Sequence, residues 1–234
     1  MRNFIRGENL FRGLRLALVA TLATSLYLAY GYLVTRRGFV ESSLGASDVA
    51  QRFSLDVLGA FIALFISATA GFAWASRPPL AGFGSLRTVR RDLWLILPAG
   101  AALALVILFV LEPLLYKPLV PAQRNPFEPV FVGLFEEVIC RWGILAIAYR
   151  LSRRVWPSIL TAAAFNVVIA LNPTLKLLAA SGEPLEAWRL VGLVLVKFAL
   201  AVGLGLLCVR KGLFSTMALR FVAALPAPIL ALLT

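Results

Sequence analysis

The chain has 234 residues, of which 61% are hydrophobic and 15% charged, and its mean hydropathy is +0.89. In a soluble domain about a quarter of the residues are charged. This composition therefore excludes a soluble globular protein and predicts an integral membrane protein. The net charge of +12 would suggest nucleic acid as the partner of a soluble protein. Here the basic residues lie between apolar runs, where they indicate membrane topology and contacts with lipid headgroups. We therefore expect membrane lipids, and no nucleic acid, as partners.

Seven apolar segments follow one another along the chain. Five are long enough to cross about 30 Å of hydrocarbon: Leu16–Val34, Leu55–Ala75, Leu93–Tyr116, Val130–Tyr149 and Ala187–Val209. Between the last two lies a shorter segment, Trp156–Leu171, which begins with Trp-Pro as a helix can. The final segment, Leu213–Leu233, contains Pro226 and Pro228, which predict an irregular last turn. The sequence thus predicts an all-α transmembrane bundle of about seven spans, forming a single integral membrane domain over residues 1–234.

The distribution of Lys and Arg predicts the orientation. The first segment has a basic flank, but its apolar core is too long for a cleaved signal peptide, so we expect an uncleaved first helix. With the N-terminus inside, the inner segments hold 13 of the 23 basic residues and the outer segments hold 7. This excess favours a multi-pass protein of the cell membrane with a cytoplasmic N-terminus and an outer C-terminus.

Three ionisable residues interrupt the fourth apolar segment. Glu136, Glu137 and Arg141 fall within six residues of PVFVGLFEEVICRWGILAIAY. Charged groups at bilayer depth are costly, so they mark a candidate functional site. On an α-helix Glu137 and Arg141 share a face and can pair, whereas Glu136 points about 100° away.

The string FEEVICRWGIL resembles the EExxxR motif of the CPBP family of intramembrane proteases, which includes CAAX prenyl proteases and bacteriocin-processing or immunity proteins. The next helix resembles the family's second motif, FxxxH, with Phe165 in the Phe position and Ile169 in the histidine position. The segment KGLFSTMALRFVAAL resembles the third motif, HxxxN, with Arg220 and Ala224 in the His and Asn positions. The resemblance covers residues 130–234 and implies a four-helix CPBP-like core there, with 1–129 forming peripheral helices.

The chain departs from the family pattern because it contains no histidine. The resemblance implies a glutamate that activates water, aided by two histidines and an asparagine. Ile169 can neither ligate a metal nor form a hydrogen bond, and Arg220 is always protonated. A histidine-ligated metal centre and a Ser-His or Cys-His nucleophile are therefore excluded, and we expect no cofactor and no metal. Cys140 and Cys208 lie in apolar helices, where we expect small core residues.

Two interpretations of the carboxylates remain open. A glutamate buried in apolar surroundings could act as a general base on water, with Arg220 stabilising an oxyanion. In the other interpretation Arg141 and Arg220 neutralise Glu136 and Glu137 and occupy their lone pairs. The equal numbers of acids and arginines favour this ion-paired site.

Other polar residues lie at membrane depth. Asn166 could donate a hydrogen bond to one of the two glutamates, or could join two helices, and with Phe165 it is the candidate binding residue. Lys197 lies in the middle of a helix and could pair with Asp56 or Glu112, or mark an ion path.

Three functions are compatible with these features. The favoured one is a degenerate CPBP-like protein, weakly active or inactive, that binds a membrane peptide or a lipidated protein tail. The alternative is an active glutamate-dependent intramembrane endopeptidase. The third, a small transporter or channel subunit, would be expected to show two related halves with interrupted helices, and the sequence has no such symmetry.

Overall fold

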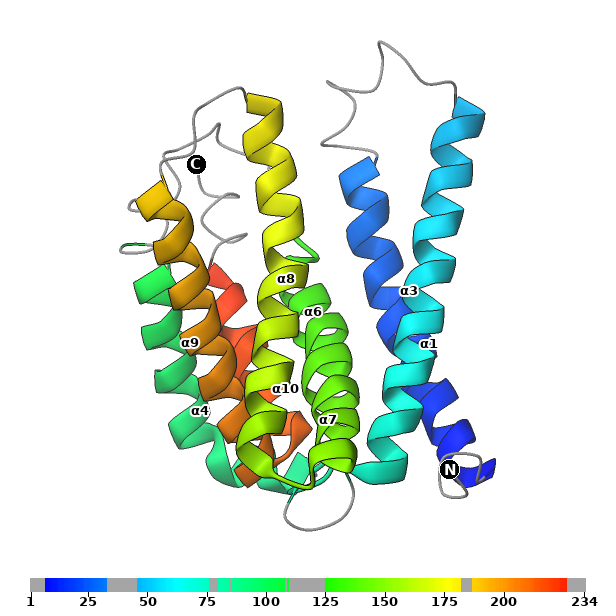
Figure 1. The fold of residues 1–234 in the computed structure, drawn as a ribbon. Coiled ribbons are helices and arrows are strands. Elements are labelled where there is room, and N and C mark those ends of the chain that lie inside the picture. Colours follow the sequence, from blue (N-terminus) through cyan, green and yellow to red (C-terminus); the bar gives the residue numbers. More distant parts are fainter. Residues whose placement is uncertain are drawn as a thin grey trace.

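The computed structural model describes residues 7–32, 46–75, 80–84, 86–107, 109, 125–181 and 187–226, and within them the fold is helical, with no strand. The helices alternate in direction along the bundle (Figure 1). In chain order they are α1 (Gly7–Tyr30), α3 (Ala46–Trp74), α4 (Leu86–Val106), α6 (Glu128–Phe131), η3 (Val132–Ile144), α7 (Leu145–Ser152), α8 (Val155–Ser181), α9 (Ala187–Lys211) and α10 (Leu213–Ala224).

Each predicted segment coincides with a helix or a helical run, but the ends differ. Helices α3 and α4 begin earlier than predicted, and α8 extends for 27 residues, beyond the predicted end at Leu171. The fourth segment is one continuous run of α6, η3 and α7. Helix α10 ends at Ala224, just before Pro226, as expected from the ring of proline. Pro228 and the last part of the third predicted segment lie outside the described residues.

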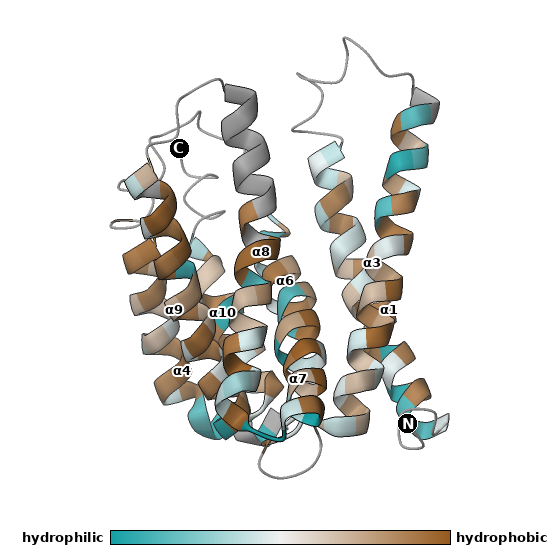
Figure 2. Cartoon of the chain, in the orientation of Figure 1, coloured by the Kyte–Doolittle hydropathy of each residue, from teal (hydrophilic) through white to brown (hydrophobic). Residues whose placement is uncertain are grey.

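Three of the described helices are long and apolar enough to cross a membrane. They are Gly7–Tyr30 in α1, Asp48–Trp74 in α3 and Leu190–Lys211 in α9, while Val155–Ile169 and Leu213–Ala224 are shorter apolar helices. Hydrophobic residues predominate along the bundle (Figure 2). Large apolar side chains such as Leu22 and Leu55 are exposed on its surface. Such a surface is expected of a membrane protein, in which lipid covers the exposed apolar residues.

Helix η3 lies at the centre of the bundle and packs against α1, α3, α8, α9 and α10. Two glycines permit its close approach to α3. A Cβ atom on Gly71 would collide with the ring of Trp142, and one on Gly143 would collide with Ser67. Trp142 is 1% exposed, and the rings of Phe72 and Phe83 meet it edge-on, each at 5.3 Å between centroids. The core of the bundle is therefore built around the helix that carries the charged residues.

The segment 80–84 joins the start of α4 to the turn between α9 and α10. The backbone N–H groups of Leu213 and Phe214 donate to the carbonyl oxygens of Gly82 (3.3 Å) and Phe83 (3.1 Å). These bonds satisfy two of the N–H groups that the first turn of α10 leaves unpaired. Gly82 and Gly212 have φ angles of 75° and 90°, a backbone region that disfavours residues with a Cβ atom.

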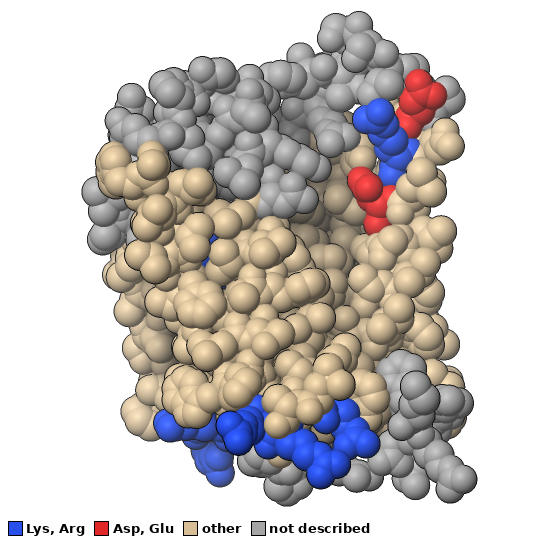
Figure 3. All heavy atoms as spheres, in the orientation of Figure 1, with Lys and Arg blue, Asp and Glu red and all other residues tan. Residues whose placement is uncertain are grey.

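The charged residues are distributed unevenly. Lys and Arg gather at the end of the bundle that holds the N-terminus, and most of the surface between the two ends is uncharged (Figures 1 and 3). The turns that connect α7 to α8 and α9 to α10 lie at this same end. We call it the basic end.

Candidate functional site

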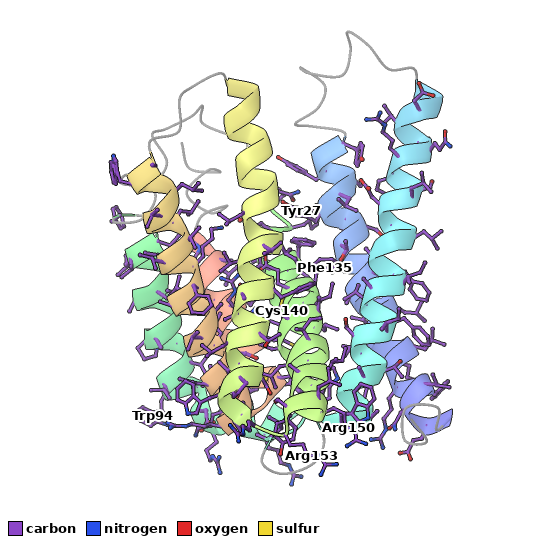
Figure 4. The ribbon with its side chains drawn as sticks, in the orientation of Figure 1. Tyr27, Trp94, Phe135, Cys140, Arg150 and Arg153 are labelled. Carbon is purple, nitrogen blue, oxygen red and sulfur yellow. The ribbon has the colours of Figure 1, made fainter. Side chains whose placement is uncertain are left out.

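The candidate site is a cluster of four ionisable side chains near the middle of the bundle, which we call the ion cluster. Glu136, Glu137 and Arg141 come from η3, and Arg220 comes from α10, which packs against η3. Cys140, the neighbour of Arg141 in sequence, lies well inside the bundle, far from the arginines at the basic end (Figure 4). The Glu137 and Arg141 side chains are 0% and 1% exposed, whereas those of Glu136 and Arg220 are 12% and 18% exposed, so the cluster is buried on one side and partly accessible on the other.

The four groups neutralise one another directly. Nη2 of Arg220 lies 2.6 Å from Oε2 of Glu136, and its Nε lies 3.6 Å from Oε1 of Glu137. Nη1 of Arg141 lies 3.4 Å from the same Oε1 of Glu137. Glu137 is thus held between two guanidinium groups, and Arg220 bridges both carboxylates. The predicted pairing of Glu137 with Arg141 and the predicted reach of Arg220 to the glutamates are both confirmed.

The helix that presents the two glutamates is a π-helix of 13 residues. The Leu145 N–H at its C-terminal end donates to the carbonyl of Cys140, five residues earlier. The π-helix is rare and is found most often as a single wide turn at functional sites. The α-helical spacing argument therefore identified the correct ion pair on a helix of the wrong type. We find no feature of the sequence that predicts the wider turns.

Asn166 is buried, 6% exposed, and binds the arginine side of the cluster. Its Oδ1 accepts a hydrogen bond from Nη2 of Arg141 at 3.5 Å, and its Nδ2 donates to Sγ of Cys140 at 3.5 Å. Asn166 therefore joins α8 to η3, as one of the two alternatives predicted. Its Nδ2, the only donor that could reach a carboxylate, is directed to Cys140 in place of the predicted bond to Glu136 or Glu137.

The three positions that the sequence resemblance assigned to motif residues and that carry no polar side chain lie in different environments. Ile169 is partly buried against the hydrophobic core, and Ala224 is the partly buried last residue of α10. Phe165 is 39% exposed on α8 and so lies at the surface of the described structure. Ile169 and Ala224 offer no group that could orient a water molecule or bind a metal.

Lys197 has neighbours that the sequence did not predict. It is partly buried on α9 and interacts electrostatically with Glu136, Arg220 and Glu128. Asp56, one of its two predicted partners, instead accepts a hydrogen bond from Tyr32 at 2.7 Å. Glu112, the other, lies outside the described residues. The depth of Lys197 in an apolar helix was the only indication that it belongs near the cluster.

A small cavity borders the Arg141 side of the cluster. A cavity of about 10 Å³ lies between segment 80–82 and η3, and its lining includes Arg141, Trp142 and Cys208 but neither glutamate. This volume is enough for about one water molecule. Among the described residues, no group of three His, Cys, Asp or Glu side chains is placed to hold a metal ion. The arrangement can hold two helices together by charge.

No protein-family model, curated protein or solved structure matches the chain.

Proposed function

We propose that this chain is a multi-pass membrane protein with a CPBP-like core that binds a membrane peptide or a lipidated protein tail without cleaving it. The observation that carries the proposal is the ion pair of 2.6 Å between Arg220 and Glu136. In the resemblance to CPBP proteases, Glu136 belongs to the pair that activates water and Arg220 occupies a histidine position. The residue that should assist the base is instead a permanent cation bound to it.

A carboxylate in such a pair is a poor general base. To activate water it must have a free lone pair directed at the water and must gain a proton in the transition state. The Arg220 guanidinium donates a hydrogen bond of 2.6 Å to Oε2 of Glu136 and so occupies a lone pair of that oxygen. Glu137 is 0% exposed, which keeps bulk water from its carboxylate, and both Arg141 (3.4 Å) and Arg220 (3.6 Å) lie beside its Oε1.

Binding without cleavage requires only the scaffold of the family and an apolar surface. Phe165 occupies the Phe position of the second motif and is 39% exposed on α8, where a membrane-embedded segment could reach it. The ion cluster would then hold η3, α8 and α10 in place. This half of the proposal rests on the resemblance and on the exposure of Phe165.

The membrane topology is part of the proposal. We propose seven spans, with the basic end of the bundle facing the cytoplasm of the cell and the N-terminus therefore cytoplasmic. The support is the positive-inside rule, applied to arginines that the fold collects at one end.

The test uses protein reconstituted in liposomes and a farnesylated peptide that becomes fluorescent when cleaved. We expect saturable binding and no cleavage that depends on Glu136, measured by comparing the unmodified protein with Glu136→Gln. Phe165→Ala should weaken binding. Leu160→Ala is the matched control, because Leu160 is similarly exposed (45%) on the same helix but does not occupy a motif position, and it should leave binding unchanged. Cleavage that Glu136→Gln abolishes would instead establish the glutamate-dependent endopeptidase, and absence of binding would overturn the binding role.

A gain-of-function variant tests the CPBP-like core itself. Ile169→His, Arg220→His and Ala224→Asn together restore the family's pattern and release Glu136 from its ion pair. Positioning and proton-transfer groups contribute factors of roughly 10²–10⁴ each to the rate. If the core is CPBP-like, the triple variant should acquire a peptidase activity that Glu136→Gln removes. A folded triple variant without activity would count against the resemblance.

A further inference from the structure

Arginines from three separate parts of the chain lie exposed at the basic end of the bundle. They come from the first turns of α4, from the turn between α7 and α8, and from the end of α9. Figure 3 shows Lys and Arg side chains as a band across this end. We call this set the basic ring: Arg87, Arg90, Arg91, Arg150, Arg153, Arg154 and Arg210.

The basic ring is a product of tertiary structure. Its segments are separated by tens of residues, and the contacts between α7 and α8, α8 and α9, and α4 and α10 bring them to one end. A Cβ atom added to Gly205 of α9 would lie 2.9 Å from Cγ2 of Ile159 in α8, so the two helices approach closely here. This close packing holds the α7–α8 turn beside the end of α9. Arg150 and Arg153 point away from the bundle at this end (Figure 4).

Acidic side chains do not neutralise the ring. At the basic end, within the described residues, Asp92 is the acid closest to it, and this carboxylate is already paired with Lys211 at 3.2 Å. Arg91 also approaches Asp92, at 3.5 Å, while its own side chain is 74% exposed. Two cations therefore share one buried carboxylate, and the other arginines of the ring have no ion pair with a described residue.

Two exposed tryptophans lie next to the ring on the side of the apolar surface. Trp94 of α4 is 76% exposed and lies one turn beyond Arg90, and Trp156 of α8 is 58% exposed, two residues after Arg154. Tryptophan is enriched at the boundary between hydrocarbon and headgroups, where its ring is apolar and its N–H is polar. Trp94 and Trp156 therefore mark the level of this boundary on the bundle. The arginines lie just beyond it, at the depth of the lipid phosphates.

We propose that the basic ring binds the phosphate groups of anionic phospholipids in one membrane leaflet. The chemistry recognised is a phosphodiester anion, and arginine suits it because the planar guanidinium can donate two hydrogen bonds to one phosphate. A zwitterionic lipid offers the same phosphate but brings its own cation, which the unneutralised ring repels. The inference depends on the membrane location in the proposed function and is independent of any role of Glu136.

The test measures how strongly brominated lipids quench the tryptophan fluorescence of the protein in liposomes. We expect brominated phosphatidylglycerol to be preferred over brominated phosphatidylcholine, and the preference to weaken as salt is raised. Each basic residue close to an anionic surface contributes roughly a factor of five to binding. Arg150→Gln, Arg153→Gln and Arg154→Gln together should therefore reduce the preference by up to about a hundred-fold. Arg52→Gln, on the exposed first part of α3 at the opposite end, is the matched control and should leave the preference unchanged.

Further arms of the experiment distinguish the outcomes. Arg87→Gln with Arg90→Gln provides a second variant in case the first does not fold, and it should also reduce the preference. Inorganic phosphate should not displace phosphatidylglycerol, because a lipid site needs both the anion and the membrane surface; complete displacement would identify a soluble anion site instead. Equal quenching by both lipids, or a preference that survives in both variants, would overturn the proposal. Absence of quenching by either lipid would contradict the membrane location and hence that part of the proposed function.

Discussion

The ion cluster and the basic ring both contain arginines, but the arginines are buried and paired in the first and exposed in the second. Arg141 and Arg220, with side chains 1% and 18% exposed, each contact a glutamate. Most arginines of the basic ring are exposed and have no acidic partner among the described residues. A buried charge is destabilising unless it is paired, whereas a charge at the membrane boundary is solvated by water and by lipid phosphates. Pairing is therefore required in the first region and is dispensable in the second.

This difference separates the effects expected from mutation. Removing one member of the ion cluster leaves its partner buried without a counter-charge, so the free energy of unfolding should fall. Removing an arginine of the basic ring should weaken binding of anionic lipid and leave the stability almost unchanged. Asp92 and Lys211 lie between these extremes, because the carboxylate is 7% exposed and the ammonium group belongs to a side chain that is 36% exposed.

The largest effect is expected for Arg220→Ala. This change leaves Glu136 and Glu137 with one arginine between them, and we expect a loss of about 3–5 kcal/mol in the free energy of unfolding. It can be measured by denaturation in detergent micelles. The double variant Glu136→Gln with Arg220→Ala should be less destabilised than Arg220→Ala alone, because the unmatched charge is removed. Arg210→Ala in the basic ring is the control, expected within about 0.5 kcal/mol of the unmodified protein. Additive effects in the double variant would contradict the ion pair.

A smaller loss is expected for Gly71→Ala, which tests the packing that holds the ion cluster in place. The added methyl group would collide with Trp142 and push η3 away from α3. Overpacking of this kind costs about 1–3 kcal/mol. Gly59→Ala, on the same helix with no atom within 4 Å of the added Cβ, should be neutral or slightly stabilising. If the two variants unfold at the same temperature, the close contact between α3 and η3 does not exist.

Arg141→Lys should have a comparable or smaller effect, although it keeps the charge. A lysine can remain paired with Glu137, but it is a point charge on a flexible stem and cannot also donate to Asn166 in the geometry of the guanidinium. We expect a loss of about 1.5–3 kcal/mol, the value of a hydrogen bond to a charged group. Asn166→Ala should cost little more when added to Arg141→Lys, since both remove the same bond. Independent, fully additive losses would show that the two side chains do not interact.

The smallest effect is expected for Asp92→Asn. Because Lys211 is partly solvated, its ion pair with Asp92 should contribute about 1 kcal/mol or less. The variant should lose this amount in low salt and almost nothing in high salt, where the interaction is screened. It should also increase the preference for anionic lipid, because a negative charge beneath the basic ring is removed. A large loss of stability that persists in high salt would place Asp92 with the buried cluster instead.

Several properties could be predicted from the sequence because they depend on composition or on local spacing. The apolar segments predicted where the helices lie. The four-residue spacing of Glu137 and Arg141 predicted their ion pair, because residues four apart are neighbours on a helix. Arg220 was predicted as the further partner because few other acids lie at a similar depth, and a buried arginine needs one.

Other properties depended on contacts between distant residues. The close approach of Gly71 to Trp142, and the bonding of Asn166 to Arg141 and Cys140, follow from how helices meet in space. The π-helical turns of η3 also escaped prediction, since their hydrogen bonds change the register without changing which residues are apolar.

The sequence by itself determined that this chain is helical, apolar and basic, and that its midchain glutamates need cations. Tertiary structure decided how Arg220 bridges both carboxylates and where the remaining arginines gather. The physical reason is that hydrophobic periodicity and side-chain charge are properties of neighbouring residues. The meeting of η3 with α10, and of the turns at the basic end, is settled only when the helices pack and bury those charges or leave them exposed.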